Sequence, residues 1–220
     1  MDVRNVLILT GRDMATFIVV DDHPLARLAI RMILEKSDHQ VLAEAGDGDV
    51  VQQLLNSHKP DALILDIDLP GINGIDVIAA LRATGNRTPI VVMSGKNADY
   101  YAVESMKAGA NGFISKQNNL EGLLLAVNAV LSGYGYFPLR MHATYDVSAH
   151  ASDSDKIRLL SKREFEVLRY LAEGKEIISI AGRMKISNKT VSTYKARLMD
   201  KLGLKNQRDL LEFARRNNIN

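Results

Sequence analysis

The stretch Phe17-Ile18-Val19-Val20-Asp21-Asp22 joins four apolar residues to two carboxylates, and it sets the pattern for the first half of the chain. A short apolar run rich in β-branched residues is typical of a strand buried on both faces. Three later runs, 62–65, 90–93 and 112–115, are each followed by a polar side chain: Asp66, Ser94 and Lys116. We therefore expect four buried strands whose carboxyl ends carry charged or hydroxyl groups.

Amphipathic segments separate these runs, so strands and helices alternate along the chain. We expect strands at 17–20, 40–45, 62–65, 90–93 and 112–115, and helices at 24–36, 49–57, 74–83, 98–108 and 120–132. In the first helix one apolar stripe contains Leu25, Leu28, Ala29, Met32 and Ile33. Five successive strand–helix units predict an α/β fold, a five-stranded parallel, doubly wound, flavodoxin-like sheet. Ligands bind such sheets at the carboxyl ends of the strands.

Composition narrows the possible functions. The chain has 220 residues, which suits two domains, and no cysteine, which excludes disulfides, thiolate zinc sites and cysteine nucleophiles. No apolar run approaches the ~20 residues of a membrane helix, and we find no export signal. We expect a cytoplasmic protein with no membrane partner.

The charge is divided unevenly along the chain. Residues 1–158 carry 14 Lys and Arg against 19 Asp and Glu, a net charge of −5, whereas residues 159–220 carry 14 against 7, a net charge of +7. A basic C-terminal unit favours a polyanionic partner such as nucleic acid. A solvated basic surface without a partner is the alternative on charge alone.

These patterns predict an N-terminal extension at 1–13, an α/β domain at 14–138, a linker at 139–157 and a helical domain at 158–220. We hypothesise that Met14 is the true start. The residues of the linker are small and polar, and they show neither a helix nor a strand period. The helical domain should contain four short helices. Ser161 and Glu164 form a capping box, and Ser187 caps a helix that runs to Leu202.

The polar groups at the strand ends predict a site for a cation and a phosphoryl group. Carboxylates at Asp21, Asp22 and Asp66 repel one another unless a cation or a proton is present, and oxygen ligands suit Mg²⁺ (or Mn²⁺). Asp66 is then placed to attack phosphorus, while Lys116 and Ser94 contact phosphoryl oxygens. Taken alone, an Asp-Asp pair at the end of a strand usually belongs to a turn and has no catalytic or metal-binding role. His23 is expected to be solvated or capping rather than a ligand, because magnesium prefers oxygen.

This set resembles the receiver domain of bacterial two-component response regulators. The matching residues are Asp21, Asp22, Asp66, Pro70, Gly74, Ser94 and Lys116. The resemblance implies phosphorylation of Asp66 by a histidine kinase or phosphotransfer domain, a metal ligand from the Asp68 carbonyl, and a switch role for Phe113. Gln117 departs from the pattern, because most receivers have proline there, and this leaves the rigidity of the Lys116 loop in question.

The basic unit can form one small helical core. Its predicted members are Val167, Leu168, Leu171, Ile180, Ala181, Met184, Val191, Leu198 and Leu202. The helix capped by Ser187 carries short side chains beside cations on its other face, which suits a major groove. A helical bundle with a merely charged face is the alternative from spacing alone.

The segment also resembles the LuxR-type helix-turn-helix, and with the receiver it is similar to the NarL/FixJ class of response regulators. By this resemblance the DNA face contains Lys189, Ser192, Thr193, Lys195 and Ala196, and Lys201 lies near the DNA backbone. Thr190 and Arg197 are further predicted DNA-binding residues. Leu210, Leu211 and Phe213 lie on a last helix that pairs two such domains in a homodimer. Ile177 and Ile178 replace polar residues of the family pattern.

The sequence therefore predicts a phosphorylation-controlled DNA-binding transcriptional regulator, not an enzyme, that binds promoter DNA as a dimer and has RNA polymerase as a further possible partner. Two alternatives stay open. The chain could bind DNA without phosphorylation, or it could be a phosphotransfer protein whose C-terminal helices bind protein. The phosphotransfer protein would show no salt-sensitive affinity for DNA, so a titration of DNA binding against salt separates it from a DNA-binding regulator.

Overall fold

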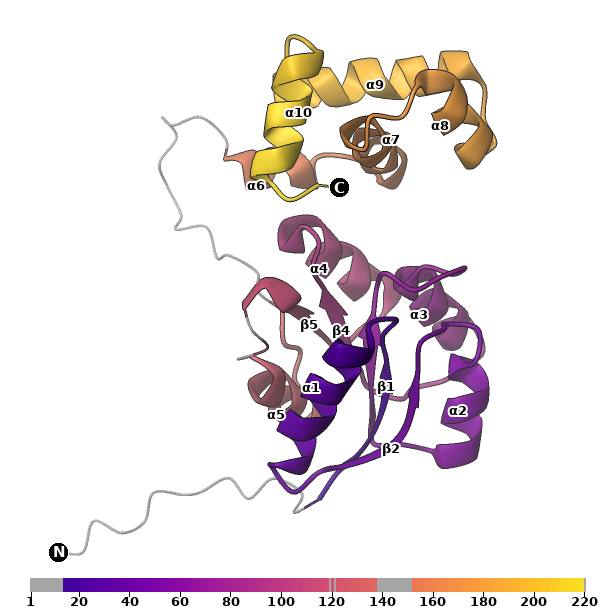
Figure 1. Ribbon diagram of the computed structural model, residues 1–220, viewed down its shortest axis with the longest axis vertical. Helices are drawn as coiled ribbons and strands as arrows, with labels where there is room; N and C mark the ends of the chain where they lie inside the picture. Colours follow the sequence, from indigo (N-terminus) through magenta and orange to yellow (C-terminus); the bar gives the residue numbers. More distant parts are fainter. Residues whose placement is uncertain (1–13, 119, 121, 138–151, 220) are drawn as a thin grey trace, which may run out of the picture. The chain divides into compact units, whose positions relative to one another are not determined.

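The computed structural model describes residues 14–118, 120, 122–137 and 152–219, which form an α/β unit and a helical unit (Figure 1). The predicted N-terminal extension, 1–13, and residues 139–151 of the predicted linker lie outside the described residues.

The α/β unit is built on a five-stranded parallel sheet of order β2-β1-β3-β4-β5. Its strands are β1 (Thr16–Val20), β2 (Gln40–Ala45), β3 (Ala62–Asp66), β4 (Ile90–Ser94) and β5 (Gly112–Ser115). The register aligns their carboxyl ends: Val20 pairs with Leu65, Asp66 with Met93, and Ser94 with Ser115. The predicted fold class is confirmed, and the four polar strand ends meet at one edge.

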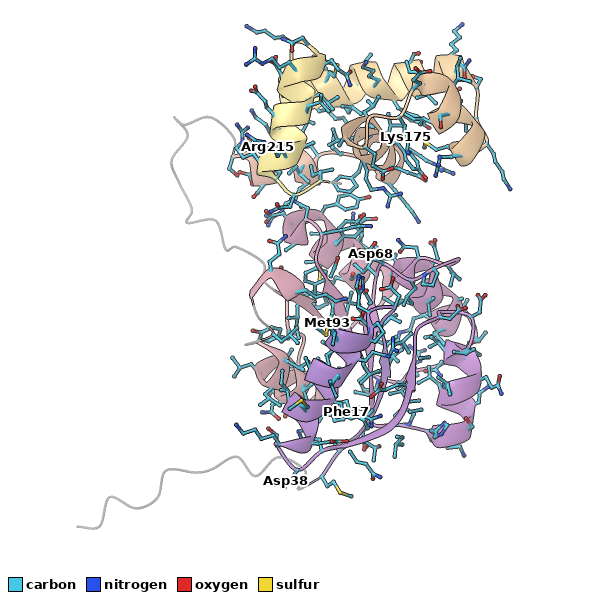
Figure 2. All side chains as sticks on the ribbon, viewed as in Figure 1. Phe17, Asp38, Asp68, Met93, Lys175 and Arg215 are labelled. Carbon is cyan, nitrogen blue, oxygen red and sulfur yellow. The ribbon has the colours of Figure 1, made fainter. Side chains whose placement is uncertain are left out.

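Helices cover both faces of this sheet (Figure 1). The helices are α1 (Pro24–Glu35), α2 (Val51–His58), α3 (Gly74–Ala83), α4 (Ala98–Ala108) and α5 (Leu123–Leu131), with a 3₁₀ turn η1 at Lys116–Asn118. Side chains of α1 and α5 share one buried cluster with β1, β3, β4 and β5, whereas α2 and α3 lie on the opposite face. Phe17 and Met93, labelled in Figure 2, belong to the buried cluster.

Two local predictions are wrong. In α1 the buried residues are Ile30 and Leu34, while Leu25, Leu28 and Met32 of the apolar stripe are 81%, 52% and 61% exposed. Ile33 of the same stripe is partly buried against the cluster, so the stripe coincides only in part with the buried side of α1, which packing on the sheet selects.

The last helix of the α/β unit begins at Leu123, not at residue 120. The chain first makes the 3₁₀ turn η1, and Leu120 has a φ of 60°, in the left-handed region. That conformation is incompatible with a continuous right-handed helix.

The helical unit contains α6 (Asp153–Arg158), α7 (Lys162–Ala172), α8 (Ile177–Met184), α9 (Asn188–Leu202) and α10 (Gln207–Arg216). The capping box of Ser161 and Glu164 and the Ser187 cap are present as predicted. All nine predicted core residues are buried. Helix α6 was missed: all of it except Arg158 lies within the range predicted as linker, and it begins with a capping box of Ser152 and Asp155.

No helix among the described residues is both long and apolar enough to cross a bilayer.

Candidate acidic site and nucleic-acid interface

The carboxyl-end edge of the sheet gathers the predicted acidic residues around Lys116. Asp21 directly follows β1 and Asp66 ends β3, and these two strands are neighbours. The Nζ atom of Lys116 lies 2.6 Å from Oδ2 of Asp21 and 2.8 Å from Oδ2 of Asp66. One ammonium therefore bridges the two carboxylates, although the three residues are up to 95 positions apart in the sequence.

The electrostatic interactions among these three charged groups are strong because the two carboxylates are buried. Asp21 and Asp66 are 1% and 2% exposed. Burial raises the pKa of Asp66, and the hydrogen bond and charge of Lys116 only partly offset that effect. For Lys116 burial by itself lowers the pKa, but the hydrogen bonds and charges of Asp21 and Asp66 outweigh it and the pKa is raised. The ammonium is thus kept charged beside a carboxylate that lacks full compensation.

The same residues fit a divalent cation. Ligand atoms of Asp21, Asp22, His23 and Asp66 all lie within 4.8 Å of one another, which is close enough for the group to hold a metal ion. The buried Asp66 carboxylate is paired with the single cation Lys116 and also accepts a backbone hydrogen bond from Asp68, but it is repelled by the charge of Asp21. Carboxylate oxygens are the donors that a hard cation prefers.

His23 lies at the mouth of this cluster. It is the N-cap residue of α1, its backbone N–H donates to Oδ1 of Asp21, and its side chain is 69% exposed. Its Nδ1 lies 2.5 Å from Oδ1 of Asp22. The expected solvated position is confirmed, and the contact with Asp22 adds a partner that sequence reasoning missed.

The remaining predicted residues of this edge come from neighbouring segments. Ser94 ends β4 and is fully buried, and Phe113, also fully buried, pairs with Val92 in the β5 register. Asp68 follows β3 by two residues, in the loop beyond the strand (Figure 2). The roles of these three residues stay predictions.

Gly74 allows the backbone of Asp66 to pack against α3. A Cβ atom on Gly74 would lie 2.2 Å from the backbone oxygen of Asp66 and 2.9 Å from Cα of Ile67. The Gly74 N–H donates to the Ile67 carbonyl, and Asn73 caps α3 by accepting from the N–H of Ile75. This close approach explains the Gly four residues after Pro70 and fixes the carboxylate in place.

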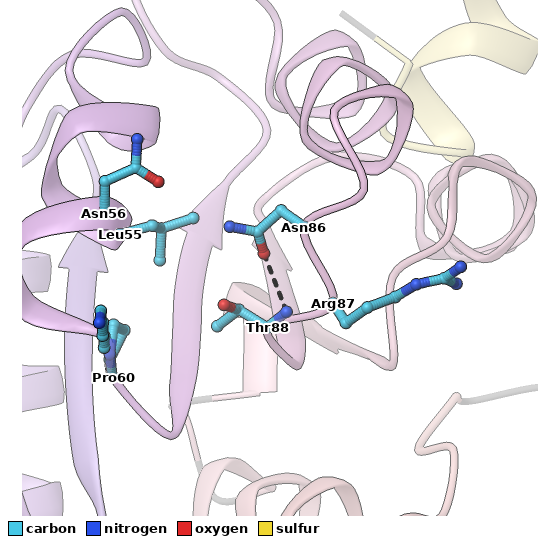
Figure 3. A pocket seen from close by; sticks show the side chains of 7 residues that line it. Leu55, Asn56, Pro60, Asn86, Arg87 and Thr88 are labelled. Atoms are coloured by element: carbon cyan, nitrogen blue, oxygen red, sulfur yellow. Dashed lines mark hydrogen bonds between the residues drawn. The ribbon is translucent and has the colours of Figure 1, made fainter.

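A separate hollow of about 490 Å³ lies at the opposite edge of the sheet (Figure 3). Leu55, Asn56, Lys59, Pro60, Asn86, Arg87 and Thr88 line it. Lys59 and Pro60 precede β3, and Thr88 precedes β4, so this hollow is at the amino ends of the strands. It contains no carboxylate among its lining residues and is unrelated to the acidic cluster.

In the helical unit, α9 presents the predicted DNA face to solvent. Lys189, Ser192, Thr193, Ala196 and Arg197 are exposed, whereas Thr190 and Lys195 are half-buried. The Ser187 hydroxyl accepts from the N–H of Thr190 and orders the amino end of the helix. The Lys195 ammonium donates to Oε1 of Gln207 on α10 at 2.9 Å. This amide oxygen is a neutral acceptor, so the bond does not neutralise the charge of Lys195.

Other predicted residues of this unit are placed differently. Nζ of Lys201 lies 2.6 Å from Oε2 of Glu164 and donates to the Leu159 carbonyl, so its ammonium is already engaged inside the unit. Leu210 and Phe213 are buried, while Leu211 is 42% exposed. A helix pair formed through α10 would therefore use Leu211, and the contributions of Lys201, Leu210 and Phe213 to binding stay untested predictions.

Comparison with known proteins agrees with this arrangement. Residues 17–128 match the response regulator receiver domain family, and residues 158–214 match the bacterial regulatory proteins of the luxR family. The DNA-binding transcriptional activator EvgA of Escherichia coli (strain K12) is 45% identical over 202 residues, covering 92% of this chain and 98% of EvgA.

BvgA of Bordetella pertussis (strain Tohama I), named as a positive transcription regulator of virulence factors, is 37% identical over 203 residues, covering 92% of this chain and 97% of BvgA. The solved structure of RcsB from Salmonella enterica serovar Typhimurium, bound to promoter P1flhDC in the presence of phosphomimetic BeF3−, is 27% identical with a TM-score of 0.57. That alignment covers 90% of this chain and 97% of RcsB.

The fold and the acidic edge define a two-component response regulator. The chain belongs to this family, in the class that joins a receiver domain to a LuxR-type DNA-binding domain. It is a DNA-binding transcription regulator and not an enzyme.

Proposed function

We propose that Asp66 is the residue that accepts the phosphoryl group and that its phosphorylation controls how α9 binds promoter DNA. The observation that carries this proposal is the buried cluster in which Asp21, Asp66 and Lys116 meet, where one ammonium contacts two carboxylates. A buried carboxylate beside a fixed cation suits nucleophilic attack on phosphorus, because the cation neutralises the incoming phosphoryl oxygens.

In the proposed reaction an oxygen of Asp66 attacks the phosphorus of a phosphohistidine on a histidine kinase or phosphotransfer domain. The P–N bond breaks, the imidazole leaves with its electron pair, and an acyl phosphate forms on Asp66. Lys116 stays charged and neutralises the incoming phosphoryl oxygens, and the Ser94 hydroxyl donates to one of them. Phe113 then repacks as Ser94 moves, which changes the surface near α4 and β5.

Mg²⁺ (or Mn²⁺) would be held by Asp21, Asp22, Asp66 and the carbonyl of Asp68. When bound, it supplies positive charge that offsets the carboxylates and the phosphoryl oxygens. The oxygen-rich donor set of the cluster supports this assignment.

The partner of the helical unit is proposed to be double-stranded promoter DNA, bound by two copies of the chain in the cytoplasm. The exposed face of α9 and its capped amino end support this assignment, because helix N-termini attract phosphate and short side chains reach base edges. RNA polymerase is a further proposed partner.

The deciding experiment combines phosphoryl transfer with DNA binding. Parent and Asp66→Asn chains are incubated with acetyl phosphate and Mg²⁺, and intact mass is measured. We expect one phosphoryl adduct on the parent and none on the variant. Equal labelling of the two chains would show that another residue is the acceptor.

DNA affinity is then measured by fluorescence anisotropy for both chains, with and without the phosphodonor. We expect tighter binding only for the treated parent. Equal affinity in all four samples would favour a regulator that binds DNA without phosphorylation.

A further inference from the structure

The side chain of Gln117 connects the chain segment after Lys116 to the segment after Ser94. It follows Lys116 in η1, and Gly95 follows Ser94 at the end of β4. The side-chain Nε2 of Gln117 donates to the backbone carbonyl of Gly95 at 2.8 Å. A single hydrogen bond therefore joins the residue after the ammonium to the residue after the hydroxyl.

This bond begins where the sheet ends. Ser94 and Ser115 form the last register pair of β4 and β5, and beyond them the two main chains are no longer paired. The Gln117 backbone N–H donates to the Ser115 hydroxyl at 3.3 Å, which turns the chain, and the side chain then reaches across to Gly95. The side-chain amide thus adds one hydrogen bond between the two segments just beyond the last paired residues of β4 and β5.

The link matters because Lys116 needs a fixed position. Its ammonium contacts two carboxylates from β1 and β3, and a displacement of the loop would move it away from both. An exposed glutamine would ordinarily point into water, but here its amide is bound to a loop 22 residues earlier in the chain. Proline is what most receivers have at this position, and Gln117 has no ring to stiffen the chain.

We propose that Gln117 is a positioning residue that holds the Lys116 and Ser94 loops together, so that the ammonium and the hydroxyl approach the phosphoryl group of Asp66 as one unit. This inference rests on the proposed function of Asp66. It assigns to the Gln117 side chain the restraint that a proline ring would otherwise provide, by a different physical means.

Two substitutions in the full-length chain separate the hydrogen bond from the bulk of the side chain. Gln117→Ala removes both, whereas Gln117→Met keeps a similar size without adding charge but has no N–H to donate to the Gly95 carbonyl. Gln53→Ala, an exposed glutamine on α2, is the matched control. The measured quantity is the rate of acceptance from acetyl phosphate at fixed Mg²⁺, together with Mg²⁺ affinity by titration.

We expect both Gln117 variants to accept phosphate about two- to tenfold more slowly, the range that corresponds to the net contribution of one hydrogen bond. Mg²⁺ affinity should be unchanged, because none of the carboxylates is altered, and the control should match the parent. Parental rates in both variants, or slowing in the alanine variant alone, would overturn the proposal.

A second measurement is independent of phosphorylation. In the ¹⁵N-labelled chain, the Nε2 hydrogens of Gln117 should exchange with water more slowly than those of Gln53. Equal exchange would overturn the proposed bond. If the parent accepted no phosphate, the role of Asp66 would fail, and the exchange result would still decide whether the two loops are joined.

Discussion

At Asp66 two electrostatic effects oppose each other. Burial disfavours the carboxylate and raises its pKa, while the Lys116 ammonium at 2.8 Å stabilises the charge. Asp21 shares the same ammonium at 2.6 Å and adds repulsion. The pocket therefore holds more negative charge than one cation balances, which is a favourable starting point for binding a divalent ion.

Gly74 lies so close to the Asp66 backbone that an added side chain should destabilise the fold. In Gly74→Ala the new Cβ would collide with the Asp66 backbone oxygen, so we expect a loss of about 1–3 kcal/mol in the free energy of unfolding, as for overpacked sites. Urea denaturation measures it. Gly182→Ala, in α8 with nothing within 4 Å of its Cβ, is the control and should be stabilised by up to about 1 kcal/mol. Equal stability of Gly74→Ala and the parent would contradict the close packing.

Glu164 gives a pH prediction. Burial would raise its pKa, but hydrogen bonds from Lys201 and Ser161 outweigh that effect, and the pKa is lowered. A lowered pKa means that the ion stabilises the fold above the unfolded pKa, and that this stabilisation is lost as pH falls through the folded pKa. We expect Glu164→Gln to be less stable by about 1–3 kcal/mol at pH 7, with the difference shrinking in acid.

Thermal or urea unfolding at several pH values measures this difference. Glu212→Gln is the matched control, because Glu212 and Arg208 form an exposed pair whose contribution is small. A pH-independent difference for Glu164→Gln would show that the side chain acts by packing and not by charge.

At the scale of elements, local signals and tertiary packing contribute differently. The caps of α7 and α9 follow directly from Ser161 and Ser187, because a hydroxyl there satisfies N–H groups that the helix leaves free. The buried side of α1 depends instead on the sheet beneath it, and the start of α5 depends on the turn that places Lys116. Helix α6 was missed because its polar sequence lacks an apolar period, although its capping box of Ser152 and Asp155 was a readable signal.

If the Lys195 ammonium contacts a DNA phosphate, Lys195→Ala should reduce the slope of log affinity against log salt by about one. Its bond to Gln207 involves a neutral acceptor and leaves donors on the ammonium for a phosphate. Fluorescence anisotropy over a salt series measures the slope.

Lys107→Ala, which removes an exposed lysine paired with Glu104 on α4, is the control and should leave the slope unchanged. If Lys195→Ala had the parental slope as well, its predicted contact with the DNA backbone would be wrong.

At the scale of the whole molecule, the sheet of the α/β unit is complete from Thr16, and its edge joins residues from β1, β3, β4 and β5. We therefore expect a chain that starts at Met14 to unfold at the same urea concentration as the full chain and to accept phosphate at the same rate. Circular dichroism and mass spectrometry test this. Loss of either property would show that residues 1–13 contribute to folding or to phosphoryl acceptance.

Sequence alone was enough to predict the order of strands and helices in the α/β unit, the division into an acidic and a basic unit, and the polar residues of the acidic edge. It could do so because strand and helix periods are local, and because parallel strands bring their carboxyl ends to one edge. Only the tertiary structure decided the buried side of α1, the close approach of Gly74, the pairing of Lys201 with Glu164 and the bond from Gln117 to Gly95. Each of these depends on contacts between residues distant in sequence, and no local period or cap specifies such contacts.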